Sequence, residues 1–313
     1  MSRVVTLGES MGLILGDGVG GWENQHHARV VTGGAEGNTA IGLSRLGVDV
    51  TWIGRVGDDA LGRRVVGDLR AEGVDVRAHT DAEAPTGLML KSTPRAGATT
   101  VDYYRRGSAG SRLHRADLDD LPLSAGDILH VTGVTLALSA SAREAVVAAV
   151  DRAREVGALV SFAINHRSRL WGHAEAVAAY AHVIERTDIL FASDDEARMM
   201  HPHVDPEDLA RALSSTGPAE AIVTLGGDGA VAVIDGEVHR VAALPITPVD
   251  TVGAGDAFAA GYLSERLVAA SAATRMRTAA VAGAYACLHP GDWQGGIRRS
   301  ELASAGSTDP VTR

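Results

Sequence analysis

The segment 249–258 (VDTVGAGDAF) places two glycines and a carboxylate at the start of an expected helix. Gly253 and Gly255 allow backbone conformations and close approaches that larger residues resist. Their N–H groups, together with those of the first helical turn, can converge on an anion such as a phosphate. Asp256 then stands where a general base for an attacking hydroxyl would lie beside that phosphate. A structural turn without chemistry uses the same glycines, so this segment alone leaves both interpretations open.

A second glycine-rich segment, 33–40 (GGAEGNTA), opens another expected helix. Gly33 and Gly34 would let a polyhydroxylated ligand approach the backbone, and Asn38 would hydrogen-bond its hydroxyls. The alternative is a helix N-terminus softened by glycine, with no ligand.

Arginines follow two expected strands and suggest an anionic ligand. In the segment 103–106 (YYRR), strand alternation puts Tyr103 and Arg105 on one face. A phenol beside a guanidinium suits a hydroxylated carboxylate, because arginine binds carboxylates through two parallel hydrogen bonds. Arg167, in the segment 165–171 (NHRSRLW), is a second candidate for the same anion. An edge strand with a solvated charge gives the same pattern.

Two further segments indicate a nucleotide and its metal ion. In 193–196 (SDDE), Glu196 could organise Mg²⁺ and its waters, although capping of a helix by Ser193 explains most of the pattern. The segment 224–229 (TLGGDG) is a strand, a glycine turn and a strand start. It could admit a nucleotide phosphate or ribose, or be a plain hairpin turn.

Familiar motifs of other protein classes lack their context. The segment 16–21 (GDGVGG) fits G-x-G-x-x-G, but it leads into a strand instead of a crossover helix, so a dinucleotide site is not expected. The sequence contains no P-loop motif, and its histidines and Cys287 show no zinc spacing.

The expected elements place these segments at one edge of a sheet. From about residue 120, buried strands at 128–131, 158–162, 189–191 and 221–225 alternate with helices at 141–155, 174–185 and 207–214. This alternation predicts an α/β fold with a mainly parallel sheet covered on both faces. Ligands bind beyond the carboxyl ends of such strands, and each candidate segment from 165 onward follows one.

The first 110 residues combine core elements with a second sheet. Strands at 4–7 and 50–53 and helices at 36–46 and 60–72 belong to the core. Half-exposed strands are expected at 13–15, 29–32, 87–92 and 99–104, the last two as a hairpin. They predict a small antiparallel β-sheet lid. We therefore expect one domain over 1–313, with lid strands from about 12–33 and 86–106 inserted in the core and a flexible tail at 303–313.

Composition restricts the class of protein. The 313 residues are 45% hydrophobic and carry a formal net charge of −10, which argues against a nucleic-acid partner. Cys287 is the only cysteine, so an intrachain disulfide is impossible and a reducing, cytoplasmic location is expected. No apolar run approaches 18 residues, so a membrane partner or span is not expected.

Taken together, these motifs resemble the PfkB, or ribokinase-like, family of sugar kinases, over roughly residues 4–298. Gly33-Gly34 with Asn38, the turn at 224–226 and the segment 250–256 occur in the family's order. Within the family, the segments 33–36, 103–105, 165–171 and 291–293 make the chain most similar to the 2-keto-3-deoxygluconate kinases. The resemblance implies a ribokinase-like three-layer core with a β-lid that mediates homodimers or higher homo-oligomers.

The resemblance also implies roles for individual residues. Asp256 would be the catalytic base, and Gly253, Ala254 and Gly255 would form the anion hole. The sugar acid would be bound by Gly33, Gly34, Asn38, Tyr103, Arg105, Arg167 and Asp292. The ATP site would include Ser193, Thr224, Gly226, Gly229, Gly253, Gly255, Ala284 and Cys287. Glu196 would act on Mg²⁺ through water, and activation by a monovalent cation such as K⁺ near Asp250 stays open.

Two departures from the family pattern concern the metal side of the site. Ala163 stands where relatives commonly have Asp, and Ser193 where they usually have Asn. They leave two alternatives to an ATP-dependent kinase of a sugar acid. One is a kinase of another sugar or nucleoside, such as ribose, fructose or adenosine; the other is a non-catalytic sugar or nucleotide sensor on the same fold.

Overall fold

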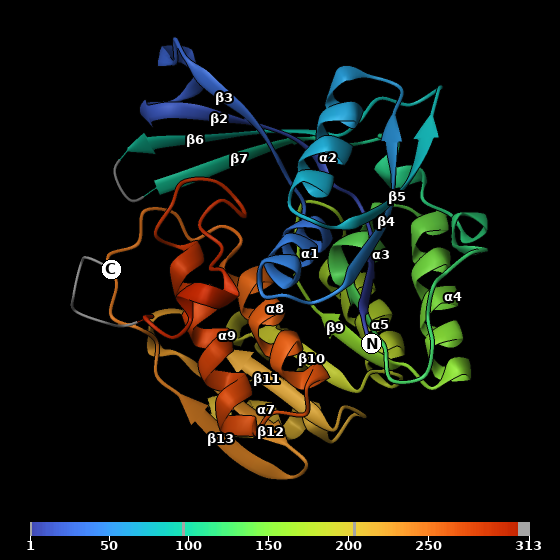
Figure 1. Ribbon diagram of the computed structural model, residues 1–313, viewed down its shortest axis with the longest axis vertical. Helices are drawn as coiled ribbons and strands as arrows, with labels where there is room; N and C mark the ends of the chain where they lie inside the picture. The colour runs from blue at the N-terminus through green and yellow to red at the C-terminus, as the bar shows by residue number, and fades with distance from the viewer. Residues whose placement is uncertain (1, 96–97, 203–204, 306–313) are drawn as a thin grey trace.

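The computed structural model describes residues 2–95, 98–202 and 205–305, and these form a large central sheet (Figure 1). Its nine strands lie in the order β13-β12-β11-β10-β9-β8-β1-β4-β5. Their bounds are β1 Val4–Leu7, β4 Val50–Gly57, β5 Asp75–Asp81, β8 Ile128–Thr132, β9 Leu159–Ala163, β10 Ile189–Ser193, β11 Glu220–Thr224, β12 Ala230–Ile234 and β13 Glu237–Val241. The pairings from β5 to β11 are parallel, and β12 and β13 add an antiparallel edge.

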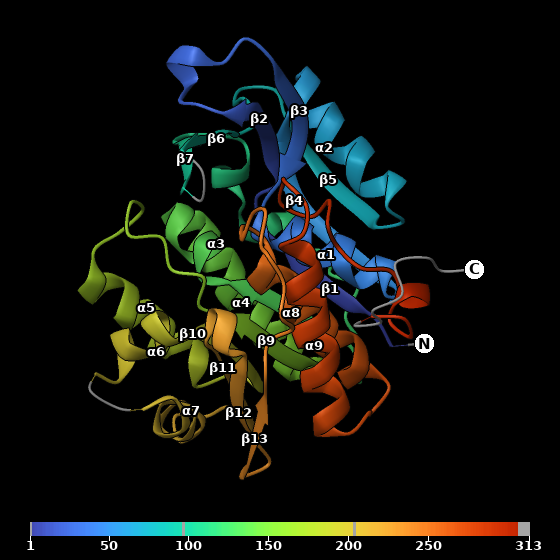
Figure 2. The same ribbon diagram turned by 90° about the vertical axis from the view of Figure 1, so that its left-hand side faces the viewer.

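Helices cover both faces of this sheet (Figure 2). One face carries α3 Gly133–Leu138, α4 Ala140–Val156, α5 His173–Ile184, α6 Asp194–Met200 and α7 Pro206–Ser214. The other carries α1 Ala35–Arg45, α2 Ala60–Ala71, α8 Ala254–Leu267 and α9 Ala272–Ala286. The predicted three-layer α/β core with a mainly parallel sheet is therefore confirmed.

Alternation along the strands divides the core between the two layers. In β1, Val5 and Leu7 pack in the cluster beneath α4 and α5, whereas Val4 packs in the cluster beneath α1 and α8. All four β1 residues are buried, as expected for a central strand with helices on both sides. A strand with both faces buried must be covered on both sides, so β1 requires a helical layer on each face of the sheet.

The second sheet lies apart from the core at one end of the molecule (Figure 1). Its order is β3-β2-β6-β7, with bounds β2 Met11–Val19, β3 Ala28–Gly33, β6 Leu88–Arg95 and β7 Ala98–Tyr104. The two outer pairings are antiparallel, and β2 pairs with β6 in parallel. Met11, Leu13 and Met89 form its buried face. The segment 16–21 runs along β2 into the short helix η1 Trp22–Asn24 and then β3, so the expected lack of a crossover helix is confirmed.

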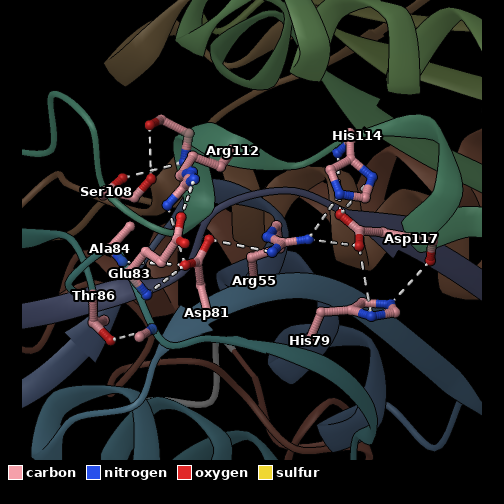
Figure 3. A network of polar contacts seen from close by, with 12 residues as sticks. Arg55, His79, Asp81, Glu83, Ala84, Thr86, Ser108, Arg112, His114 and Asp117 are labelled. Atoms are coloured by element: carbon pink, nitrogen blue, oxygen red, sulfur yellow. Dashed lines mark hydrogen bonds and ion pairs between the residues drawn. The ribbon is translucent and has the colours of Figure 1, made fainter.

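A polar network ties the base of the lid to the edge of the core (Figure 3). Arg55 on β4 contacts Asp117 at 2.8 Å and Asp81 at 3.2 Å. The Asp81 carboxylate also accepts hydrogen bonds from the N–H of Glu83 and from Arg112. The backbone donation from Glu83, helped by Arg55 and Arg112, lowers the pKa of Asp81. The chain is thereby anchored where it enters β6 and where it leaves β7.

Some of the chain was not assigned from its sequence pattern. The edge strands β5 and β13 were not expected, because strands of mixed polarity lack a clear buried run. β12 begins after the turn at 224–229, where the sequence pattern indicated a strand start. The predicted flexible tail falls from residue 306 onward outside the described residues. Among the described residues, every helix is too short or too polar to span a bilayer.

Candidate active site

The helix α8 begins where the glycine-rich segment predicted it. Gly253 is the N-cap residue and has a φ of +82°, which favours glycine. A Cβ at this position would lie 1.8 Å from the main-chain oxygen of Asp292, so a side chain is excluded on steric grounds as well. The first-turn N–H groups of a helix lack intrahelical acceptors. The turn therefore presents donors to an anion, with Asp256 in the same turn.

Two amide side chains flank the Asp256 carboxylate. The Nδ2 of Asn38, in the first turns of α1, donates to Oδ2 at 2.8 Å. The Nδ2 of Asn165, which follows β9 and has a φ of +41°, lies 3.5 Å from Oδ1. Both contacts orient the carboxylate, and the contact with Asn38 is the shorter of the two.

The surroundings of Asp256 adjust its affinity for a proton. The side chain keeps partial access to a cavity, but dense protein around it removes most of its water. This desolvation raises the pKa of Asp256 to about 7, against the lowering effects of the Asn38 hydrogen bond and the positive charge of Arg167. Asp292 and Glu36 add a further raising effect on that pKa. A carboxyl group with a pKa near 7 suits general-base work at neutral pH.

A cavity of about 400 Å³ opens above Asp256 and lies between α1, α8 and the lid. Most residues predicted to bind a sugar acid line it: Gly34, Asn38, Tyr103, Arg105, Arg167 and Asp292. Gly33 lies directly behind, because a Cβ there would meet Asp292 Oδ2 at 2.4 Å. The fold thus brings together residues from four separate stretches of the chain.

The two arginines of this cavity differ in their partners. Arg105 is buried and pairs with Glu9, with its Nη2 at 2.6 Å and its Nε at 2.7 Å from Glu9 Oε2. Ser108 donates a further hydrogen bond to Glu9. Arg167 is exposed, and its guanidinium contacts the main-chain oxygen of His166 at 3.4 Å. Glu9 already neutralises Arg105, so Arg167 is the better placed cation for an incoming carboxylate.

A basic vestibule adjoins the cavity above Asp256, which is called the acceptor cavity from here on. This second hollow of about 710 Å³ shares Tyr103, Arg105 and Arg167 with the cavity above Asp256. Arg106 and Arg169 add further positive charge to its wall. An anionic ligand would be attracted along this path.

A third cavity, of about 440 Å³, lies on the other side of the glycine turn and is called the nucleotide-sized cavity below. Six residues predicted to bind ATP line it: Thr224, Gly226, Gly229, Gly255, Ala284 and Cys287. The remaining lining is largely apolar, including Leu244, Pro245 and Ile246. Gly255 and Thr251 line both this cavity and the one above Asp256, so two bound molecules would meet at the start of α8.

The acidic segment 193–196 forms a capping box at the start of α6. Ser193 Oγ accepts from the Glu196 N–H at 3.2 Å, and Glu196 Oε2 accepts from the Ser193 N–H at 2.8 Å. Glu196 Oε1 also accepts the N–H of His166 at 2.7 Å. The structural interpretation of this segment is confirmed, and Ser193 lies outside the lining of the nucleotide-sized cavity. Within the described ranges, no group of three or more acidic, histidine or cysteine side chains could hold a metal ion.

Three residues that contact the predicted site residues were not themselves named as site residues from the sequence. Glu9 and Asn165 each follow or adjoin a strand end, and Asn165 precedes Arg167 by two residues, which was the available signal. Lys91 is a buried lysine at the end of the apolar stretch of β6. A charged residue directly after the apolar residues 88–90 of a lid strand was its only signal.

Two cavities that meet at a helix N-terminus beside a carboxylate define a site for group transfer between a nucleotide and a polar acceptor. The comparisons agree with this geometry. Residues 1–295 match the family described as "pfkB family carbohydrate kinase". The chain belongs to this family of carbohydrate kinases.

Individual relatives and solved structures match between about three quarters and nearly all of the chain. The chain is 34% identical over 311 residues to the 2-dehydro-3-deoxygluconokinase of Bacillus subtilis, covering 96% of this chain and 94% of the relative. It is 37% identical over 240 residues to the enzyme of that name from Thermoproteus tenax, covering 74% and 73%. Among solved structures, a PfkB protein from Polaromonas sp. JS666 superposes with a TM-score of 0.87 at 34% identity, over 97% of this chain and all of that one.

Two other solved neighbours contain bound ligands. A putative ribokinase II from E. coli in complex with ATP and Mg²⁺ is 27% identical with a TM-score of 0.87, over 97% and 98% of the two chains. A double mutant of Vibrio cholerae fructokinase, with fructose, ADP and a potassium ion, is 28% identical with a TM-score of 0.88, over 97% and 98%. The ribokinase-like fold expected from the motifs is therefore confirmed.

Proposed function

We propose that this kinase transfers the γ-phosphoryl group of ATP to a hydroxyl of a sugar acid, and that 2-keto-3-deoxygluconate is its acceptor. The observation that carries the proposal is the position of Asp256, a carboxyl with a pKa of about 7 where the two cavities meet. The two relatives named 2-dehydro-3-deoxygluconokinase support the choice of sugar acid. The exposed Arg167 and the basic vestibule support an anionic acceptor.

The chain's own residues divide the work. Asp256 accepts the proton of the attacking hydroxyl, within the 2.6–3.2 Å reach that general-base catalysis requires. The N–H groups at the start of α8 stabilise negative charge on the transferred phosphoryl group. Arg167 binds the carboxylate of the acceptor, and Asn38 fixes the orientation of the base. The lid covers the acceptor cavity and limits the access of water, which would otherwise hydrolyse ATP.

We propose ATP and Mg²⁺ as the cofactors. Mg²⁺ keeps several waters and binds to nucleotide phosphates with few protein ligands, so the lack of a ligand cluster among the described residues fits it. Glu196 retains acceptor capacity besides its two backbone hydrogen bonds, so it is the residue that would hold a water of the ion. The apolar cavity lined by Ala284 and Cys287 would receive the adenine.

The lid also supports a proposal on assembly. Val30 and Tyr104 on the lid are 44% and 62% exposed, and Ile14 lies beside Val30 in the strand register. We propose a homodimer or higher homo-oligomer through the lid, to be checked by light scattering of the purified protein. A monomer at micromolar concentration would contradict this part of the proposal.

An ADP-release screen tests the reaction. Purified protein with ATP and Mg²⁺ is offered 2-keto-3-deoxygluconate, 2-keto-3-deoxygalactonate, ribose, fructose and adenosine. We expect the highest kcat/KM with 2-keto-3-deoxygluconate. A higher value with a neutral sugar or nucleoside would overturn the acceptor assignment, and tight binding of all ligands without ADP release would favour a sensor.

A further inference from the structure

Lys91 is buried beside the acceptor cavity, although it lies on a lid strand. Its side chain is 2% exposed, and its ammonium group contacts residues outside the lid. The Nζ atom lies 2.5 Å from Asp250 Oδ2, 3.0 Å from the main-chain oxygen of Gly291 and 3.2 Å from Asp292 Oδ1. Burial of a charged amine is costly unless its donors are satisfied. Three oxygens match the three donors of an ammonium group, so this position is specific.

The oxygens around Lys91 belong to the two loops that hold the glycine turn. Asp250 Oδ1 accepts the N–H of Val252, and Asp250 Oδ2 accepts the N–H of Gly291, each at 3.2 Å. The main-chain oxygen of Asp292 packs so closely on Gly253 that only glycine fits. The ammonium therefore connects β6, the loop before α8 and the loop at 291–292. Any shift of these loops moves the N–H groups that would bind the phosphoryl group.

A free alkali cation does not fit this arrangement. Two carboxylates and a carbonyl are an oxygen donor set that suits a hard cation, and a solved fructokinase neighbour contains a potassium ion. In this chain Lys91 supplies a positive charge at Asp250, where activation by K⁺ was left open. A second cation would meet repulsion from the ammonium at short range.

We propose that Lys91 is a positioning residue that acts as a built-in monovalent cation: it fixes the loops around Gly253 and makes phosphoryl transfer independent of K⁺. The inference rests on the proposed function, because the loops matter through transfer at Asp256. It also explains why a lid strand carries a buried charge. The lid and the phosphoryl site are joined by one ammonium, so a lid strand contributes directly to the geometry of transfer.

The first measurement is the cation dependence of the unaltered kinase. Turnover is measured on the acceptor that the ADP-release screen identifies, at constant ionic strength in KCl, NaCl or tetramethylammonium chloride. We expect kcat to vary by less than about twofold, since the charge is already in place. A stimulation of fivefold or more by K⁺ would overturn the proposal. Absence of turnover with every acceptor in every salt would instead contradict the proposed function.

The second measurement uses Lys91→Ala and Lys91→Met. The alanine variant leaves space for a small cation, whereas methionine fills the space with an uncharged chain. A misplacement of about 1 Å can cost about 100-fold in rate, so we expect a loss of that order in kcat in both variants. We expect 100 mM K⁺ or NH₄⁺ to restore the alanine variant at least tenfold and the methionine variant hardly at all.

The controls separate positioning from general stability. Thermal unfolding establishes that each variant is folded, and ATP affinity is expected to stay within about threefold, because Lys91 does not line the nucleotide-sized cavity. A folded Lys91→Ala protein that is fully active without K⁺, or that no small cation rescues, would overturn the proposal. If neither variant folds, the salt series on the unaltered kinase decides alone.

Discussion

Asn38 and Asp256 are 218 residues apart in the chain, and the Asn38 amide nitrogen lies 2.8 Å from a carboxylate oxygen of Asp256. The contact exists because the first turns of α1 and α8, which pack against each other, converge at the same point. The hydrogen bond favours the ionised carboxylate, and burial favours the protonated one. The pKa of about 7 is thus the balance of two opposed effects.

Replacing the base tests whether proton removal limits the reaction. Asp256→Asn keeps the size of the side chain and an acceptor for the Asn38 amide. We expect kcat to fall by at least about 100-fold, since general-base assistance contributes roughly 10²–10⁴ in rate. ATP affinity, measured by calorimetry, should stay close to that of the unaltered protein. Near-normal turnover in this variant would remove Asp256 from the mechanism.

The pH profile reports on the same group. The ionised form of Asp256 accepts the proton, so kcat/KM should rise with pH, with a midpoint near 7 and a plateau above it. Asn38→Leu removes a hydrogen bond that lowers the pKa of Asp256, so its midpoint should move to higher pH. Thr39→Ala is the matched control, because Thr39 contacts only the main-chain oxygen of Asp256. A midpoint unchanged by Asn38→Leu would contradict the assignment.

The two arginines of the acceptor cavity should respond differently to removal. Arg167 is exposed, so Arg167→Met should leave the melting temperature nearly unchanged and raise KM for the sugar acid at least tenfold. Arg105→Met leaves the buried Glu9 carboxylate without its cation, which is costly, so this variant should lose several degrees of melting temperature. The double variant Glu9→Gln/Arg105→Met should recover part of that loss. Equal effects of Arg105→Met and Arg167→Met on stability would refute this distinction.

Much of the fold was predictable because it depends on local pattern. Buried apolar runs such as 128–131 and helices such as 141–155 carry their signal within a few residues, and the structure contains them within one or two residues of the expected bounds. The pattern gave no such signal for β5, which alternates polar and apolar residues at a partly exposed edge. The parallel pairing of β2 with β6 depends on contacts between distant segments, which no local pattern specifies.

The site was predictable to the extent that chemistry marks its residues. The glycines and carboxylate at 253–256 stand together in the sequence, and Arg167 follows a strand end. The pairing of Arg105 with Glu9 joins residues 96 positions apart, and that of Lys91 with Asp292 joins residues 201 positions apart. Neither partner reveals the other in the sequence. The sequence therefore indicated which side chains could act, but not which were already neutralised.

Enlarging a residue of the nucleotide-sized cavity should separate ATP binding from acceptor binding. Ala284 lies near the end of α9 and lines this cavity but not the one above Asp256. Ala284→Leu would occupy space expected to hold the adenine, so KM for ATP should rise about tenfold or more while KM for the sugar acid changes little. Initial-rate measurements with each substrate varied in turn give both values. A larger effect on the sugar acid would place the nucleotide elsewhere.

The raised pKa of Asp256 also predicts a cost in stability. An unfolded aspartate has a pKa near 4, whereas the folded site holds Asp256 at about 7. Folding is therefore favoured by the protonated carboxyl below pH 4, and this contribution is lost as the pH rises from about 4 to about 7. Above pH 7 the full cost applies. Asp256→Asn cannot ionise, so at pH 8 it should be more stable than the unaltered protein by an amount on the order of 4 kcal/mol. We expect a rise of several degrees in the midpoint of thermal unfolding at pH 8, and a smaller difference at pH 4.5, where the native carboxyl is already protonated. A variant that is less stable at pH 8 than at pH 4.5, relative to the unaltered protein at each pH, would show that Asp256 is not held against its tendency to ionise.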